Sequence, residues 1–263
     1  MIIDAHTHIH PEKDAYGPEF DATPERLLND LAESEVDKAV VLPLAADSPY
    51  AKRTENCFVA EWCAKAPDKL IGFASVHPLE HGDAARRLEH AVTGYGLKGL
   101  KLHPRFQGIA ADDPRIVPVV EKAAELGVPV AIDCLLWKPT PLRDQLPLNI
   151  DALCKRVPAA TIIMCHAGGF RFLDALAVAV ANDNVYLDVS VSLTYFHGTP
   201  FEDQFMFALK QVGAKRLIYG SDHPQHPLHE CYIASKAIFE THGFSKEELG
   251  CIFSGTFLSL VGG

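Results

Sequence analysis

The 263-residue sequence lacks the features that mark several protein classes. No apolar run reaches the ~18 residues of a membrane-spanning helix, and the opening Met1-Ile2-Ile3-Asp4 has neither the basic nor the apolar region of a secretory signal. Its seven cysteines are scattered without a Cys-x-x-Cys pair, which is typical of reduced thiols in a cytosolic protein. The formal charge of −10 disfavours binding to nucleic acid or to an anionic membrane. We therefore expect a cytoplasmic protein that binds neither nucleic acid nor a membrane.

Short apolar runs alternate with longer amphipathic segments along the whole chain. The strand candidates are Ile2–His6, Lys38–Leu42, Leu70–Val76, Gly99–His103, Val128–Asp133, Thr161–His166, Val185–Val189 and Arg216–Gly220. The helix candidates are Pro24–Glu33, Arg53–Lys65, Ala84–Val92, Pro114–Leu126, Ile150–Arg156, Phe172–Ala181, Phe201–Gln211 and Leu228–Glu240, followed by a last helix after Ser245. Eight strand–helix repeats without hairpin signals predict a parallel (β/α)8 TIM barrel, formed by residues 1–263 as one domain.

The first strand candidate ends in the segment Asp4-Ala5-His6-Thr7-His8, which carries two histidines. Side chains two residues apart on a strand point to the same face, so His6 and His8 can both enter the mouth of the barrel. Two imidazoles directed at one point suit Zn²⁺ and similar divalent ions. Asp4 has the same parity one layer deeper, where we expect it to accept a hydrogen bond from a ligating histidine.

Further polar residues stand at the ends of three later strands, where the chemistry of such barrels is located. The fourth strand carries Lys101 and His103 on one face. His103 would orient the substrate at the rim, and the deeper Lys101 fits a structural ion pair as well as a catalytic role. The sixth strand ends at His166 before two glycines. Asp222 follows the eighth strand, and a carboxylate there can accept the proton of an attacking water.

These segments together resemble the amidohydrolase superfamily, and more narrowly the amidohydrolase-2 branch of aminocarboxymuconate-semialdehyde decarboxylase and related aromatic-acid decarboxylases and lactonases. The resemblance spans essentially the whole chain, through Asp4-Ala5-His6-Thr7-His8, Gly99-Leu100-Lys101-Leu102-His103-Pro104, His166-Ala167-Gly168-Gly169 and Gly220-Ser221-Asp222-His223-Pro224. It implies a distorted TIM barrel with one divalent ion, usually zinc. The ion would be held by His6, His8, a fifth-strand residue and Asp222, with His166 as acid or base.

The fifth strand departs from that branch, which usually has a metal-binding histidine where this chain has Asp133. A carboxylate can bind Zn²⁺, and a site of two histidines with Asp133 and Asp222 would also suit Mn²⁺ or Fe²⁺. Three alternatives stay open. His103 or His166 supplies the missing ligand, the pocket works without metal, or Cys134 contributes a thiolate although its parity points away from the interior.

Arg105 and Arg171 directly follow two of the strands that carry site residues. In a chain of charge −10, cations at the mouth indicate a small carboxylated substrate. The leading hypothesis is metal-dependent hydrolysis of a C–O or C–N bond, with Asp222, His166 and His103 as catalytic residues. Non-oxidative decarboxylation of a small aromatic or muconate-like acid is the alternative from the same residues. A hypothesis from another functional class is a barrel that binds its ligand without catalysis, with Asp133 marking a metal position that has degenerated. A homo-oligomer is compatible with the sequence, which identifies no contact surface.

Overall fold

The strands of the protein are parallel and form two hydrogen-bonded sheets, ordered β1-β2-β3 and β4-β5-β6-β7-β8-β9. The computed structural model describes residues 1–48, 50–79, 83–136, 138 and 141–262. The strands are β1 (Ile3–Thr7), β2 (Lys38–Val41), β3 (Leu70–Gly72), β4 (Ala74–Ser75), β5 (Leu100–Leu102), β6 (Val130–Ile132), β7 (Ile162–Met164), β8 (Val185–Asp188) and β9 (Leu217–Ile218). Every predicted strand is present, with β3 and β4 as the two halves of the third.

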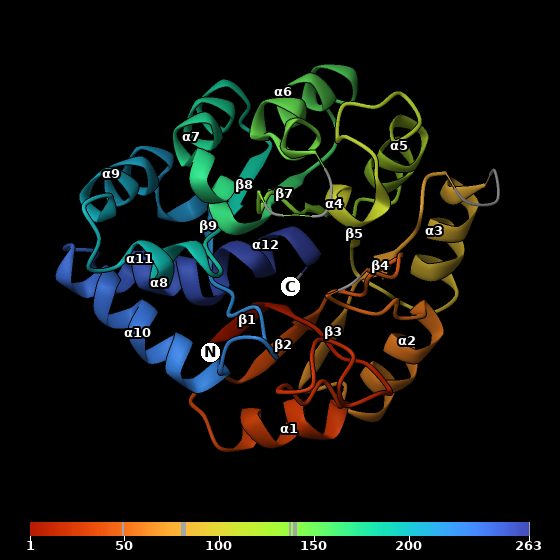
Figure 1. The fold of residues 1–263 in the computed structure, drawn as a ribbon, viewed down its shortest axis with the longest axis horizontal. Coiled ribbons are helices and arrows are strands. Elements are labelled where there is room, and N and C mark those ends of the chain that lie inside the picture. Colours follow the sequence, from red (N-terminus) through yellow and green to blue (C-terminus); the bar gives the residue numbers. More distant parts are fainter. Residues whose placement is uncertain (49, 80–82, 137, 139–140, 263) are drawn as a thin grey trace.

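Two seams join these sheets into a closed barrel (Figure 1). At the first, β3 and β4 are separated only by Phe73, whose N–H donates to the carbonyl of Val41 (2.9 Å). At the second, the chain around β9 pairs with β1: the N–H of Ala5 donates to the carbonyl of Tyr219 (2.9 Å), and that of Asp222 to the carbonyl of His6 (2.8 Å). With β3 and β4 counted as one strand, the predicted (β/α)8 barrel is confirmed.

Helices surround the ring of strands, as Figure 1 shows. They are α1 (Pro24–Ala32), α2 (Asn56–Lys65), α3 (Ala84–Thr93), α4 (Pro104–Gln107), α5 (Val117–Glu125), α6 (Pro147–Arg156), α7 (Phe172–Ala181), α8 (Ser192–Phe196), α9 (Glu202–Val212), α10 (Leu228–Thr241), α11 (Lys246–Gly250) and α12 (Thr256–Val261). The short turns are η1 (Leu142–Gln145), η2 (Cys165–Arg171), η3 (Ala214–Arg216) and the π-helical η4 (Cys251–Gly255). In the described part of the chain, no helix combines the length and apolarity needed to cross a membrane.

The predicted helices are present with shifted ends, and the differences follow from local chemistry. Thr23 caps α1, accepting from the N–H of Arg26, and Pro24 occupies the first turn, where no N–H is needed. The tail expected as one helix is divided by η4 into α11 and α12. The sequence did not predict α4 and α8, because segments of four and five residues are too short to show a helical period.

The interior of the barrel is filled by apolar side chains from strands around the ring. They are Ile3, Ala5, Val40, Leu42, Phe73, Ala131, Ile163, Cys165 and Ile218, together with Phe257 of α12. The rings of Phe73 and Phe257 pack at 6.1 Å between centroids, so α12 closes one end of the barrel. The polar side chains described next therefore lie above a packed apolar layer.

Candidate metal centre

A cavity of about 350 Å³ opens at the carboxyl ends of the strands. Its polar lining includes His6, His8, His103, Arg105, Asp133, His166 and Asp222, which are predicted site residues. Its aromatic lining is Tyr16, Tyr50, Phe106, Phe170, Tyr195 and Phe196. The site residues come from β1 and from the ends of β5, β6, β7 and β9, so the barrel gathers residues that are up to 216 positions apart, from His6 to Asp222.

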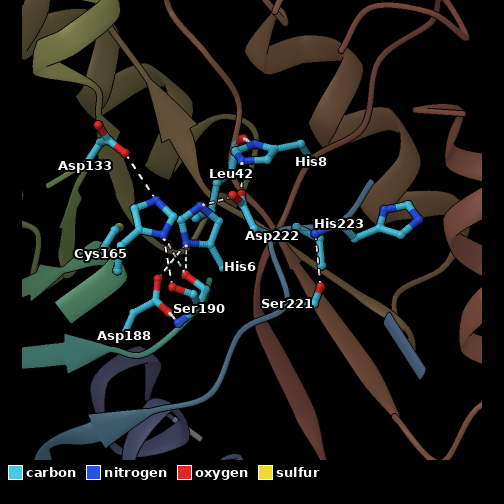
Figure 2. A network of polar contacts seen from close by, with 12 residues as sticks. His6, His8, Leu42, Asp133, Cys165, Asp188, Ser190, Ser221, Asp222 and His223 are labelled. Atoms are coloured by element: carbon cyan, nitrogen blue, oxygen red, sulfur yellow. Dashed lines mark hydrogen bonds and ion pairs between the residues drawn. The ribbon is translucent and has the colours of Figure 1, made fainter. Parts of the chain in front are cut away.

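His6, His8 and Asp222 converge on one point in this cavity, as Figure 2 shows. Oδ1 of Asp222 lies 3.4 Å from Nε2 of His6 and 3.2 Å from Nε2 of His8. All three side chains are nearly inaccessible to solvent. These residues form one of two groups of potential ligand atoms that come together among the described residues.

The donor atoms of this group fit a cation. The carbonyl of Leu42 can only accept, so Nδ1 of His8 (2.6 Å away) carries the proton and a neutral His8 presents a bare Nε2. Burial and then the charge of Lys101 lower the pKa of His6 to about 4, and its one proton lies on Nδ1, where Asp188 accepts it (2.5 Å). Two lone pairs and a carboxylate oxygen then face one another, an arrangement that a divalent ion stabilises.

The charge of Asp222 agrees with that arrangement. Burial raises the pKa of this carboxyl, but the neighbouring His6, His8 and His166 outweigh that effect and hold the pKa well below 3.8. Asp222 is therefore ionised at neutral pH. An ionised carboxylate between two imidazoles can ligate a metal ion and accept a proton from water.

Asp188 orients His6 from behind, with Ser190 beside it (Figure 2). The Asp188 carboxylate accepts from Nδ1 of His6 and from the N–H of Ser190 (2.8 Å). Burial raises the pKa of Asp188, yet His6 and His166 hold it below the ordinary value. A carboxylate that fixes a ligating histidine increases metal affinity. Sequence reasoning missed Asp188, although it stands at the end of the seventh strand, as the other site residues do at theirs.

Asp4 does accept a hydrogen bond from His6, but from the backbone N–H and not from the ring. Oδ1 of Asp4 accepts the backbone N–H groups of His6 (3.1 Å) and Ser221 (2.9 Å). The physical reason is an irregularity in β1, whose register against β2 shifts between Asp4 and Thr7. Simple alternation of side chains does not hold across that shift. Burial raises the pKa of Asp4 to about 7.

The second group of potential ligands, His6, Cys165 and Asp188, fits a cation poorly. Lys101 donates from Nζ to Sγ of Cys165 (3.3 Å), and the ammonium is completely buried. Burial lowers the pKa of Lys101, but Cys165, Asp133 and Asp188 outweigh it, so the group stays charged. A fixed positive charge repels a metal ion at that point. Lys101 therefore supports the site as an internal counter-charge.

Asp133 lies in a second polar cluster of the same cavity. Oδ1 is 3.2 Å from Nε2 of His166, and Oδ2 is 3.6 Å from Nδ1 of His103 and 3.7 Å from Nε of Arg105. Its oxygens are not among the convergent atoms of His6, His8 and Asp222. Burial raises the pKa of Asp133, but the interactions with His103, Arg105 and His166 outweigh burial and hold the pKa well below 3.8. Its role as a fourth ligand stays a prediction.

His166 connects the two clusters. Its Nδ1 donates toward the carbonyl (3.2 Å) or the hydroxyl (3.1 Å) of Ser190. The centroids of the His166 and His6 rings lie 4.8 Å apart. Burial lowers the pKa of His166, but the hydrogen bond to Asp133 and the charges of Asp222 and Asp133 outweigh it and raise the pKa above 6.5. This histidine can exchange a proton near neutral pH.

The structure separates the two arginines expected to bind substrate. Arg105 lines the cavity and lies over the ring of Phe106, 4.6 Å from its centroid. Arg171 is not among the residues that line the cavity, and it pairs with Asp174 (2.6 Å) at the start of the following helix. The expectation for Arg171 is therefore not supported by its position. An acidic residue three positions later offers the arginine a local partner, which the sequence contains and the prediction did not weigh.

Backbone strain is concentrated at the same cavity. The described non-glycine residues with positive φ are His166 (59°), Ala167 (46°), Val191 (62°) and Asp222 (73°). Three of them, all except Ala167, line the cavity. Such conformations cost about 1–3 kcal/mol each and persist where surrounding structure over-determines them, as at functional sites. The strain agrees with a site whose side chains are held in a set geometry.

Gly220 permits the close packing of this site, and Gly220→Ala should disturb it. A Cβ at this position would lie 2.6 Å from Cβ of His6 and 3.2 Å from Oδ1 of Asp188. We expect destabilisation of about 1–3 kcal/mol from overpacking, measured by denaturant unfolding, with a loss of metal affinity. Gly250→Ala is the matched control, because a Cβ there meets nothing within 4 Å and lies in a helix. Equal stability of the two variants would refute this packing argument.

Comparison with known proteins was made for sequence and for fold. A family model described as Amidohydrolase matches residues 3–256. No curated protein matches the sequence. An uncharacterized TIM-barrel protein from Bordetella bronchiseptica superposes with a TM-score of 0.82 at 18% identity, over 99% of this chain and 98% of that one.

Two further solved structures have named activities. A probable 2-pyrone-4,6-dicarboxylic acid hydrolase from Acinetobacter baumannii, with citric acid bound, gives a TM-score of 0.71 at 21% identity over 100% and 99% of the two chains. A 5-carboxyvanillate decarboxylase from Novosphingobium aromaticivorans, with manganese and a nitrobenzoic acid bound, gives a TM-score of 0.72 at 15% identity. The match covers 100% of this chain and 97% of that one. At these identities the likeness shows a shared fold.

Proposed function

Because this chain belongs to the amidohydrolase family, whose model matches residues 3–256, we propose that it is a metal-dependent hydrolase of a small carboxylated molecule. The bond broken is a C–O or C–N bond, as in a lactone or an amide. The observation that carries the proposal is the convergence of Nε2 of His6, Nε2 of His8 and Oδ1 of Asp222. A hydrolase and a manganese-bound decarboxylase share the fold, which supports chemistry of either kind at such a site.

His6, His8 and Asp222 would hold one divalent ion, with zinc expected and manganese or iron as alternatives. When bound, such an ion supplies Lewis-acid polarisation of the bond to be broken and lowers the pKa of the attacking water. Asp188 keeps His6 in the tautomer that exposes Nε2, and Leu42 does the same for His8. This support by neighbouring groups is the usual condition for a ligating histidine.

The remaining polar residues bind the substrate and move protons. Asp222 is ionised and accepts a proton from the attacking water. His166, with its raised pKa, donates a proton to the leaving group. His103 lines the cavity, where it orients the substrate. Arg105 and the aromatic walls suit a planar carboxylate.

Asp133→Asn tests the role of the fifth strand. Asp133 raises the pKa of His166, so we expect the variant to lower that pKa and to move the alkaline limb of the pH–rate profile to lower pH. The sign follows because a protonated His166 is then lost at a lower pH. We expect the bound metal, measured by elemental analysis, to be retained. Loss of the metal would instead make Asp133 the fourth ligand, and an unmoved pH profile would contradict its action on His166.

The proposed reaction is tested with the purified protein on a panel of carboxylated lactones, carboxylated amides and hydroxylated aromatic acids. We expect hydrolysis of a member of the first two groups, its loss on treatment with a chelator, and its return with zinc or manganese. Release of CO₂ from an aromatic acid without hydrolysis would establish the decarboxylase alternative. An absence of turnover in all three groups, with metal bound, would favour the non-catalytic barrel.

A further inference from the structure

A second hollow adjoins the cavity at its mouth. It is a groove of about 450 Å³ between the start of α7 and the loop that leads from α8 into α9. Its apolar lining is Phe170, Phe172, Leu173, Pro200 and Phe201. Phe170 also lines the cavity, so the two hollows meet at this ring.

A row of aromatic rings leads from the cavity to the groove. The ring of Tyr195 meets those of Phe170 and Phe196 edge-on, each at 5.4 Å between centroids. Phe196 in turn lies 6.4 Å from Phe201 in the groove and packs on the buried Phe205 at 5.0 Å. Because buried rings support the row, its outer members present a set apolar surface from the cavity outward.

The outer side chains of this row and groove are open to solvent although they are large and apolar. Phe170 and Tyr195 are 52% and 57% exposed, and Leu173 and Phe201 are 57% and 58% exposed. Single exposed apolar side chains are normal on protein surfaces, but several gathered beside a cavity are typical of a binding surface. An apolar group that covers them is stabilised by the area it removes from water.

The charged residues that line the groove, among those described, neutralise each other. They are Arg171 and Asp174, and Nε of Arg171 donates to Oδ2 of Asp174 (2.6 Å). An ionic group would have to compete with this pair, whereas an uncharged apolar group only has to cover exposed rings. The groove therefore suits an uncharged apolar group.

We propose that the ligand of this protein carries an apolar extension, an alkyl or aryl group, which leaves the cavity beside Phe170 and Tyr195 and lies in the groove against Leu173 and Phe201. This inference rests on the proposed function, since the carboxylated end of the same ligand occupies the cavity with Arg105. It narrows the substrate class to amphipathic carboxylates. A second copy of the chain would need about 20–30 residues at its interface, far more than line the groove.

The groove is tested by calorimetric titration of the metal-loaded protein with benzoate and 4-hexylbenzoate, which share a carboxylate and differ in the apolar extension. We expect the wild type to bind 4-hexylbenzoate at least about tenfold more tightly than benzoate. The double variant Leu173→Ala/Phe201→Ala should weaken 4-hexylbenzoate binding about tenfold and leave benzoate binding unchanged. Both side chains line the groove and not the cavity, and their exposure makes a folding defect unexpected.

Phe207→Ala is the matched control. Phe207 is an equally exposed phenylalanine of α9 that lines neither hollow, so its loss should change the affinity for neither probe. Sedimentation of the wild type and the double variant shows whether the groove instead joins two copies of the chain. A dimer in the wild type that becomes a monomer in the double variant would overturn the inference.

Three titration results would also overturn it: equal affinity of the wild type for the two probes, equal 4-hexylbenzoate affinity in the wild type and the double variant, or no binding of either probe. None of these readouts depends on turnover. Failure of the substrate panel with the groove effects intact would reject the proposed reaction alone. Turnover of a panel member without the groove effects would reject this inference alone.

Discussion

Asp222→Asn is expected to lower turnover by about 10³-fold, because it removes the carboxylate that both ligates the metal and accepts a proton. The substituted amide is nearly the same size, but it carries no charge. Oδ1 of Asp222 lies 3.4 and 3.2 Å from Nε2 of the two histidines, and Asp222 is the carboxylate of this convergent group. Steady-state kinetics measure the loss of turnover, and elemental analysis of the same preparation measures any loss of bound metal.

The control for this change is Asp203→Asn, an exposed carboxylate near the start of α9. It alters net charge equally and should leave both turnover and metal content as in the wild type. The strained backbone at Asp222 tolerates asparagine well, since asparagine adopts positive φ more readily than most residues. Near-wild-type turnover in Asp222→Asn would remove this residue from the mechanism.

Asp188→Asn should weaken metal binding about 10–100-fold, the usual effect of losing the partner of a ligating histidine. The carboxylate accepts the Nδ1 proton of His6 at 2.5 Å, and an amide can turn its NH₂ toward the imidazole instead. His6 would then lose both its preferred tautomer and its orientation. Competition for the metal with a chromogenic chelator gives the affinity directly.

Asp4→Asn is the matched control for Asp188→Asn. Asp4 is equally buried and lies at the same end of the barrel, but it bonds to the backbone N–H groups of His6 and Ser221. Its raised pKa, about 7, means that the neutral form is already populated at neutral pH, so an amide changes little. Equal metal affinities of the two variants would contradict the role given to Asp188.

The fold could be predicted from the sequence because each strand is a short apolar run, and because the helices between the strands repeat their apolar residues every three or four positions. The site could be predicted where a strand ends in a residue with obvious chemistry, as at His6, His166 and Asp222. Asp188 was missed because its segment, Val185–Val189, was read only as a strand and its terminal carboxylate was not tested against the rule applied to the others.

Other parts of the site depend on geometry that no sequence pattern states. The register shift in β1 turned Asp4 toward backbone amides and left the partnership with the His6 ring to Asp188 of β8, two strands away along the ring. The contacts of Asp133 with His166, His103 and Arg105 join the ends of three strands, and sequence spacing carries no information on such distances.

The most direct test of the central claim is the metal content of the purified protein and of the double variant His6→Ala/His8→Ala, measured by elemental analysis after exchange into metal-free buffer. The account predicts close to one divalent ion for each wild-type chain and essentially none for the double variant, with a folded barrel in both by circular dichroism. Equal metal content in the two proteins, or no bound metal in the wild type after incubation with zinc or manganese, would contradict it.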